Sequence, residues 1–394
     1  MSKTIIHYNI DNIDKEGANF NLIWGEKSNG KSYQVKHKKA INMYEEGGIN
    51  YISSYLNKDE VVERILNKGS RFILMRRFQD ELTSQWIESY FSNVDIENIT
   101  DGEYNGIKVY RKEIFYSFYD FDTRKERRGP KIGYAIALSE EQKYAGAVLE
   151  DVDDIIYEEF MSRTFYLHNE PNKLMTFYST VDRKKGTTKL WMVGNTTTRI
   201  NPYVNEWGLS KILFSLKQGE IKSLWLKTGE KDNEGRDVEV KLAIEHCKST
   251  GSTNYVIGTH AASTNKGEWE TDPQPKLPKK YEEYKILYKI GFEYKATRFI
   301  ADLLQDKESK DVIWFIRPHT KEFKDKIIIF SDIIKTSKYY QRDIYNISIK
   351  NDRIQRILST FRENSIFYAS DLCGTEFKQS IDFIIRKWNL WVKN

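Results

Sequence analysis

Short apolar runs, separated by stretches long enough to hold a helix, recur through the first half of the chain. The runs are rich in β-branched and aromatic residues, which favour strands. Strands that alternate with helices form parallel sheets covered on both faces. The pattern therefore predicts a doubly wound α/β core, with strands at 19–24, 71–78, 132–139, 154–160 and 189–195.

Three segments depart from this pattern. A polar and aromatic excursion that includes 124–129 separates the second and third runs, and it is typical of a loop inserted at a sheet edge. Residues 228–235 are rich in turn residues. Residues 265–278 hold three prolines within six positions, which is typical of a linker between domains.

Beyond this linker the pattern predicts a small α+β or α/β domain. Apolar runs indicate strands at 284–292, 311–316 and 326–330, and helical patterns occur within 343–361 and 376–388. A chain of 394 residues is also longer than a usual single domain. We predict three parts: a first domain at 1–225, a lid or linker region at 226–278 and a second domain at 279–394.

Composition narrows the class of protein. With 39% hydrophobic residues the chain can form packed cores, and its two cysteines lie far apart, which argues against a disulfide framework and a structural zinc site. The chain starts without the apolar region of a signal peptide, and no run approaches the ~18 apolar residues of a membrane span. We expect a cytoplasmic protein without a membrane partner. The net charge of +5 is too small to establish nucleic-acid binding.

The strongest motif follows the first predicted strand. Residues 25–32 match GxxxxGK[ST], in which consecutive backbone N–H groups surround phosphates. Lys31 would bring a positive charge to the β- and γ-phosphates, and Ser32 would bring a hydroxyl to Mg²⁺. A glycine-rich turn without a ligand is the alternative. The expected nucleotide contacts are Gly25, Glu26, Lys27, Ser28, Asn29, Gly30, Lys31 and Ser32.

An acidic pair ends the fourth predicted strand. Glu158 is expected to hold Mg²⁺ together with Ser32, and Glu159 to act as the base that activates water. The metal position more often holds Asp, so Glu158 is a departure from the usual pattern. A catalytic Glu next to the metal acid is characteristic of ATPases with an additional central strand, and the chain lacks a guanine-reading Asn-Lys-x-Asp motif. ATP is therefore the expected nucleotide.

Further polar residues complete the predicted site. Asn195, after the next strand, is expected to sense the γ-phosphate, and the alternative is a turn-forming Asn. Ring ATPases commonly take an arginine from the neighbouring subunit to stabilise charge on the transferred phosphoryl group. Arg163, Arg183 and Arg199 lie in the right stretch; we favour Arg183, and Lys143 is a second choice for this role in trans.

The order and spacing of these segments resemble the DNA-encapsidation ATPases of phi29-like small tailed phages. The resemblance is carried by 24–32, 72–77, 133–139, 154–160 and 194–203, and it covers most of the chain. It implies a P-loop ATPase of the additional-strand class, a short lid, and an RNase H-like domain that has lost its nuclease activity. It also implies a homo-oligomeric ring, a pentamer, which drives double-stranded DNA through the portal or connector protein into the procapsid. In the best-known member, the ring includes a packaging RNA.

Two parts of this resemblance can be examined in the residues. A nuclease of the RNase H-like fold needs an acid within its first strand, and 284–292 has none; Glu293, Asp302, Asp332 and Asp382 are the remaining acids considered. A translocating ring needs cations that meet DNA phosphates without reading bases. The loop candidates are Lys58, Arg124, Lys125, Arg127 and Arg128, with a further basic and aromatic stretch at 335–342; the alternative for each is a solvated surface.

The predicted protein is thus a phage genome-packaging ATPase that uses ATP and Mg²⁺ and works in the host cytoplasm, transiently at the portal vertex. Two alternatives stay open. One is a terminase-like enzyme with an active C-terminal nuclease, and the other is a DNA-binding protein that uses nucleotide only as a switch.

Overall fold

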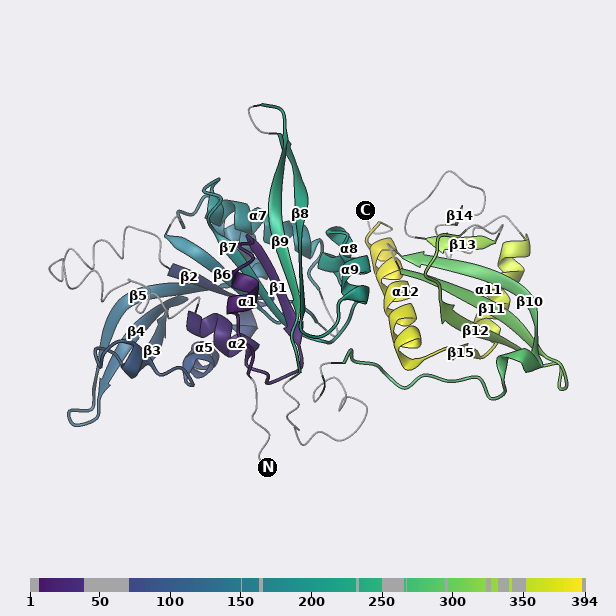
Figure 1. Ribbon diagram of the computed structural model, residues 1–394, viewed down its shortest axis with the longest axis horizontal. Helices are drawn as coiled ribbons and strands as arrows, with labels where there is room; N and C mark the ends of the chain where they lie inside the picture. The colour runs from purple at the N-terminus through teal and green to yellow at the C-terminus, as the bar shows by residue number, and fades with distance from the viewer. Residues whose placement is uncertain are drawn as a thin grey trace. The chain divides into compact units, whose positions relative to one another are not determined.

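The computed structural model describes most of the chain and divides it into two compact units (Figure 1). Unit 1 comprises Met1–Thr197, Ser215–Val256 and Ser263–Glu268, and unit 2 comprises Thr198–Phe214, Ile257–Ala262 and Trp269–Asn394. The described residues are 7–38, 71–149, 151–162, 166–231, 234–249, 266, 268–294, 297–323, 327–331, 340–341 and 352–391.

Unit 1 is built on a nine-stranded sheet with the order β3-β4-β5-β2-β6-β7-β1-β9-β8. The six strands from β5 to β9 in this order are mutually parallel, while β3, β4 and β8 pair in antiparallel fashion at the two edges. Their bounds are β1 Phe20–Gly25, β2 Arg71–Arg76, β3 Gly106–Tyr110, β4 Glu113–Asp120, β5 Lys125–Ala137, β6 Val152–Glu158, β7 Lys189–Asn195, β8 Glu220–Lys231 and β9 Asp237–His246.

Both faces of the central sheet are covered, as expected for parallel strands. One face packs its side chains, such as Ile23, Leu74 and Trp191, in a core shared with α1 Asp11–Asp14, α2 Lys31–Lys36, α5 Ser84–Phe91 and α6 Ile96–Ile99. On β6 lies α7, Glu170–Asp182, which also contacts the 3₁₀ segment η3, Leu138–Tyr144. A second 3₁₀ turn, η2 at Gln79–Glu81, follows β2. The predicted α/β P-loop fold is confirmed.

The excursion before the third predicted strand differs from the expectation. It was expected to be a loop, but it forms the ribbon β3-β4-β5, and Lys125–Gly129 lie within β5. Arg127 pairs in register with Phe118, and Arg128 with Ser117. Basic residues are tolerated in this strand because it is an exposed edge ribbon in which their side chains lie over aromatic rings.

A second difference concerns the segment after the predicted first domain. Residues 220–246 form the β8–β9 hairpin, and β9 pairs with β1 in parallel from Phe20–Leu242 to Trp24–His246. Figure 1 shows the hairpin extending beyond the neighbouring strands of unit 1. The start of the predicted lid region at 226 therefore falls inside a strand of the central sheet.

Unit 2 is built on a six-stranded sheet with the order β14-β13-β10-β11-β12-β15, in which only β11 runs antiparallel to its neighbours among the described strands. The first three strands form a meander and the fourth lies beside the first, which is the topology of the RNase H-like fold. The bounds are β10 Tyr284–Tyr294, β11 Thr297–Asp306, β12 Val312–Pro318, β13 Ile328–Ser331, β14 Tyr340–Gln341 and β15 Ile366–Tyr368.

Two longer helices, α11 Asp352–Glu363 and α12 Asp371–Trp391, accompany this sheet, and Phe361 and Phe377 from them pack on its aromatic core. Short helices α8 Pro202–Glu206 and α9 Ser210–Ser215 belong largely to unit 2 as well. A turn, η4 at Tyr281–Glu283, precedes β10. The proline-rich stretch forms neither helix nor strand from 268 to 280, and the N–H of Gln274 donates to Asp371 on α12. None of the helices in the described ranges is both long and apolar enough to cross a bilayer.

Candidate active site

The phosphate-binding loop connects β1 to α2 at the carboxyl ends of the parallel strands. Gly30, just before α2, has φ of +95°, a conformation that favours glycine. Gly25 has no room for a side chain, because a Cβ there would lie 2.8 Å from the Cβ of Cys247, directly after β9. Both glycines of the motif are thus required by the local backbone, as a close-fitting phosphate loop demands.

Lys31 links this loop to the end of β7. Its Nζ donates to the carbonyl of Glu26 at 2.7 Å and to Oδ1 of Asn195 at 2.9 Å. Burial lowers the pKa of Lys31 from its ordinary value, although neighbouring carboxylates such as Glu158 oppose the shift. The structure therefore brings together the lysine and the sensor residue predicted from sequence, beside the loop that would hold the phosphates.

Ser32 and Glu158 meet on the other side of the same helix start. The Ser32 hydroxyl donates to Oε2 of Glu158 at 3.0 Å, and the Tyr90 hydroxyl of α5 donates to Oε1 at 2.6 Å. Burial raises the pKa of Glu158, while its hydrogen bonds to Tyr90 and Ser32 act in the opposite direction. Sequence reasoning missed Tyr90, because an aromatic residue on an amphipathic helix is ordinarily read as core.

These residues fit Mg²⁺ better than a metal ion whose ligands all come from protein side chains. Among the described residues there is no group of three or more His, Cys, Asp or Glu side chains that could hold an ion. One carboxylate and one hydroxyl, Glu158 and Ser32, instead match an ion that takes its other ligands from phosphates and water.

Glu159 lies in the turn directly after β6 and differs sharply from its neighbour. Its side chain is 57% exposed and its φ is +54°, whereas Glu158 is buried. Arg76, at the end of β2, donates from one terminal nitrogen to Glu159 Oε2 at 3.1 Å and to Glu81 Oε1 at 3.0 Å. One acid of the pair is thus enclosed beside Ser32 and the other is accessible, which is the division that metal-holding and water-activating roles require.

The cations predicted to act in trans lie elsewhere. Arg183 directly follows α7. The helix begins near the carboxyl end of β6, and its 13 residues span about 20 Å, so Arg183 lies about that far from this end. A terminal nitrogen of Arg183 donates to the Ala147 carbonyl at 2.7 Å, and nearby Lys185 donates to Val152 at the start of β6. Arg183 therefore lies near the amino-terminal ends of the parallel strands, whereas the phosphate loop lies at their carboxyl ends.

Lys143 and Arg199 already have acidic partners within the chain. Lys143 is an exposed residue of η3 that pairs with Glu140, and Arg199 pairs with Glu376 within unit 2 at 2.6 Å. Arg163 falls outside the described residues. These partners of the described trans candidates thus lie outside the phosphate loop of their own chain.

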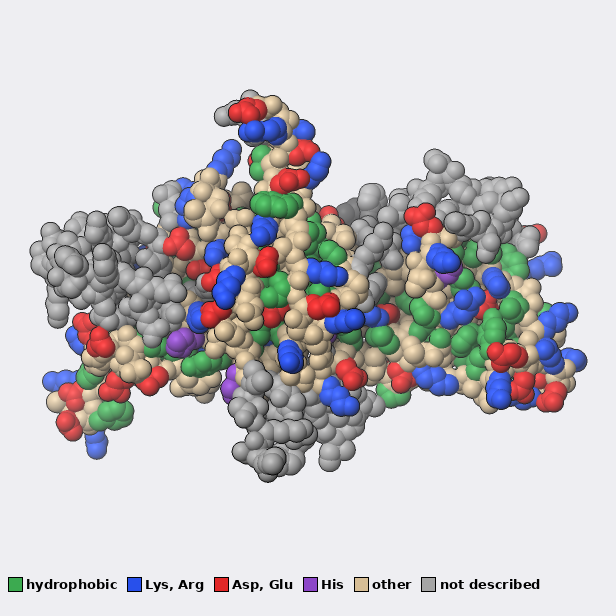
Figure 2. All heavy atoms as spheres, in the orientation of Figure 1, with side chains coloured by type: hydrophobic (Ala, Val, Ile, Leu, Met, Phe, Trp, Pro, Cys, Tyr) green, Lys and Arg blue, Asp and Glu red, His purple; other side chains and the backbone are tan. Residues whose placement is uncertain are grey.

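The predicted DNA-contacting residues gather at the end of the β4–β5 ribbon, apart from Lys58, which lies outside the described residues. Arg124 is in the turn, beside the 79% exposed Phe121. Arg127 lies over the rings of Tyr104 and Phe118, with its carbon Cζ 5.7 Å from each centroid. Figure 2 shows basic, acidic and apolar side chains mixed at this end, at lower left, rather than a uniformly basic patch.

Two of the acids considered for a nuclease site in unit 2, Glu293 and Asp302, are each paired with an arginine. Glu293, buried on β10, accepts from Arg298 at 2.8 Å, and the fully buried Asp302 on β11 accepts from Arg317 at 2.9 Å and from Tyr281. Asp302 pairs in register with Lys289, so it lies about 13 Å along the sheet from Glu293. Asp332 lies outside the described residues, as does the side chain of Asp382.

Comparison with known proteins shows similarity to phage DNA packaging proteins, in agreement with the fold and the site. The family model of the "Podovirus DNA encapsidation protein (Gp16)" matches residues 46–212. The DNA packaging protein of Bacillus phage B103 is 27% identical over 159 residues, which is 40% of this chain and 44% of that protein. The DNA packaging protein of Bacillus phage phi29 is 27% identical over 153 residues, which is 38% of this chain and 41% of that protein. The chain thus matches less than half the length of these relatives.

A solved structure, the bacteriophage phi-29 viral genome packaging motor assembly, contains a chain with the same fold. The likeness covers 97% of this chain and 100% of that chain, with 17% sequence identity and a TM-score of 0.51. The sequence matches and the shared fold together confirm the resemblance to the phi29-like phage DNA-encapsidation ATPases that the motifs predicted.

Proposed function

We propose that this chain is the ATPase subunit of a ring motor that translocates double-stranded DNA into a viral procapsid. One observation carries the proposal. The ends of three neighbouring parallel strands, β6, β7 and β1, bring Glu158, Asn195 and the phosphate loop together through the contacts of Lys31 and Ser32. This is the set of groups that binding and hydrolysis of a nucleoside triphosphate require.

Each residue has a distinct task in this proposal. The loop from Gly25 to Ser32 binds the phosphates of ATP, and Lys31 neutralises their charge. Ser32 and Glu158 would hold Mg²⁺, which neutralises charge that develops on the phosphate oxygens during transfer. Glu159 accepts a proton from the attacking water, and its exposure leaves it accessible to that water. Asn195, bonded to Lys31, senses whether the γ-phosphate is present.

The ring is proposed from the relatives and from the position of Arg183. The protein of phage phi29 is named a DNA packaging protein, and the similar solved chain is part of a viral genome packaging motor assembly. Because Arg183 lies far from the phosphate loop of its own chain, we assign it to the site of a neighbouring subunit; Lys143 is the second choice. The partners proposed are further copies, in a pentamer, DNA, the portal protein and a packaging RNA, in the host cytoplasm at the portal vertex.

We propose that the remaining parts have the roles predicted for them. The ATPase domain extends through the β8–β9 hairpin to about 246, because β9 pairs with β1. The following stretch up to 278 is the lid or linker, and 279–394 form a DNA- or partner-contacting domain that does not cleave. Pairing of Glu293 with Arg298 and of Asp302 with Arg317 supports this last point, because a metal-dependent nuclease needs free carboxylates near one another. Lys58, Arg124, Lys125, Arg127 and Arg128 are the proposed contacts with DNA phosphates.

ATP hydrolysis by the purified full chain tests the proposal. Hydrolysis should be faster with procapsids and long double-stranded DNA than with either absent, and Glu159→Gln should abolish it while Mg·ATP still binds. Normal DNA packaging by Glu159→Gln would favour the nucleotide-switch alternative. Cleavage of plasmid DNA in Mg²⁺ or Mn²⁺ would favour the terminase-like alternative.

A further inference from the structure

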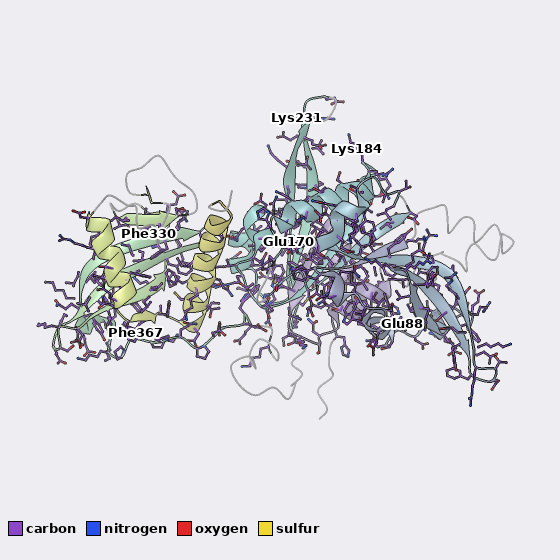
Figure 3. All side chains as sticks on the ribbon, turned by 180° about the vertical axis from the view of Figure 1, so that it is seen from behind. Glu88, Glu170, Lys184, Lys231, Phe330 and Phe367 are labelled. Atoms are coloured by element: carbon purple, nitrogen blue, oxygen red, sulfur yellow. The ribbon has the colours of Figure 1, made fainter. Side chains whose placement is uncertain are left out.

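A buried ion pair joins the end of β2 to the start of α7, behind the turn that holds Glu159. Arg77 Nε donates to Oε2 of Glu170 at 2.8 Å, and a terminal nitrogen donates to Oε1 at 3.0 Å. Glu170, labelled in Figure 3, is fully buried and also accepts from the Tyr157 hydroxyl and the Leu167 N–H. All four donors are thus directed at one carboxylate.

The same guanidinium reaches the main chain of the catalytic turn. Arg77 donates to the carbonyl of Phe160 at 2.7 Å and, more weakly, to the carbonyl of Glu159 at 3.4 Å. On its other side it lies over the ring of Tyr166, 4.8 Å from the centroid. Arg77 therefore bridges two segments, the turn after β6 and the first turn of α7, with one rigid planar group.

The turn itself is in a conformation that needs support. Glu159 has φ of +54°, in the left-handed region that residues with a side chain rarely adopt. Phe160 is held from two directions: its N–H donates to the Val193 carbonyl, and its ring lies against Gly194, where a Cβ would approach to 3.0 Å. Because φ determines where the side chain of Glu159 leaves the backbone, whatever fixes this turn also aims the carboxylate.

We propose that Arg77 and Glu170 are positioning residues for hydrolysis, which fix the left-handed turn at Glu159 and so direct its carboxylate toward the water that attacks ATP. This rests on the proposed role of Glu159 as the base. The pair acts through the main chain and touches neither nucleotide nor water. Its contribution belongs to the chemical step, since the phosphate loop is held by other contacts, those of Lys31 and Ser32.

A purely structural ion pair would behave differently, and the chain offers a matched control. Glu141 of η3 is also buried and pairs with Lys173 of the same helix α7 at 2.7 Å. In the described part of the chain, the hydrogen bonds to the carbonyls of the catalytic turn come from Arg77, the partner of Glu170, and not from Lys173. Loss of either acid weakens the attachment of α7. Only loss of Glu170 should disturb Glu159.

The experiment compares Glu170→Gln, Arg77→Lys and Glu141→Gln in the full chain, with kcat and KM for ATP, binding of Mg·ADP and thermal unfolding measured for each. Gln at 170 keeps the shape but turns an amide nitrogen toward N–H or O–H donors. Lys at 77 keeps the charge but cannot serve both partners with a fixed fork. We expect kcat to fall about 10²-fold in both variants, because small misplacement of a catalytic group has an effect of this size. KM and Mg·ADP binding should stay within about three-fold, and Glu141→Gln should retain kcat.

The outcomes separate this inference from the proposed function. If Glu159→Gln abolishes hydrolysis but Arg77→Lys, folded and with normal Mg·ADP binding, keeps the wild-type kcat, the positioning role is wrong and the ATPase proposal stands. Equal losses of kcat in Glu170→Gln and Glu141→Gln would also overturn it. Full hydrolysis by Glu159→Gln would instead overturn the role of Glu159 itself. Should Glu170→Gln unfold, Arg77→Lys alone gives the answer.

Discussion

Both units hold buried acids on a sheet, but the acids have different hydrogen-bond partners in the two units. In unit 1, Glu158 is bonded to hydroxyl groups, those of Ser32 and Tyr90, which can rearrange around an ion. In unit 2, Glu293 and Asp302 are each paired with an arginine that cannot lose its proton. Buried acids therefore indicate a reactive site only when their partners leave them free to bind something else.

The largest effect should come from removing the cation that completes the first site. Lys31→Ala leaves the phosphates without a fixed charge, and we expect kcat for ATP to fall about 10²–10³-fold. Steady-state hydrolysis of the full chain measures this. Lys189→Ala is the control. Lys189 is the first residue of β7, so it lies at the end of the strands away from the phosphate loop, where it pairs with Asp14. Equal losses in the two variants would mean that Lys31 has no special role.

A buried acid without a cationic partner tests the comparison through pH. Glu245 lies at the end of β9. In the described part of the chain its carboxylate accepts from the Tyr8 hydroxyl and has no cationic partner, and burial raises its pKa to about 7. The folded protein thus retains a proton that the unfolded chain releases near 4.5, so stability is lost as pH rises from about 4.5 to about 7. The loss amounts to at most about 3 kcal/mol.

Glu245→Gln should remove this loss, because the amide oxygen still accepts from Tyr8 and carries no charge. We expect the variant to unfold at a higher temperature than the wild type at pH 8 and at a similar temperature at pH 5. Glu239→Gln, an exposed position on the same strand, should change neither. A variant that gains nothing at pH 8 would show that Glu245 is charged without cost.

A smaller effect is expected where an arginine is removed from unit 2. Arg317→Met leaves the buried Asp302 with Tyr281 as its remaining side-chain donor in the described part of the chain. Because Arg317 is itself one-third exposed, we expect the free energy of unfolding to fall by about 2 kcal/mol, less than the roughly 3–5 kcal/mol lost when a fully buried pair is broken. Thermal unfolding together with hydrogen exchange of β11 amides measures it. Lys276→Met, which breaks a surface pair with Asp371, should cost under about 0.5 kcal/mol.

The same variant sharpens the question of cleavage. Arg317→Met should not cleave plasmid DNA in Mg²⁺ or Mn²⁺, because the freed Asp302 lies about 13 Å along the sheet from Glu293. Two metals that act together in a nuclease lie about 4 Å apart. Metal-dependent cleavage by the variant would show that the arginine alone had silenced an otherwise complete site.

The sequence predicted those parts of the site that are local in the chain. Gly25, Gly30, Lys31 and Ser32 lie in one loop, and the loop's spacing itself carries the chemistry. Glu158 and Glu159 follow an apolar run, which predicted an acidic pair at the end of a buried strand. The turn with positive φ at Glu159, which makes one side chain enclosed and the other accessible, was not predicted. Asn195 was predicted from its position after the strand that follows the acidic pair, where such ATPases carry a γ-phosphate sensor. Arg76, Arg77 and Tyr90 were missed as site residues, because no local motif marks them and each acts through a partner that only the fold brings near.

What the sequence determined by itself is the alternation of strands with helices, the phosphate loop and the acids beside it, because these depend on backbone preferences and spacing over a few residues. Only the tertiary structure decided that 220–246 complete the central sheet, that Arg77 bonds both Glu170 and the turn at Glu159, and that Glu293 and Asp302 are paired with arginines. Those outcomes depend on which distant segments pair and pack, and the free energy of such contacts is set by burial and register, which no local pattern specifies.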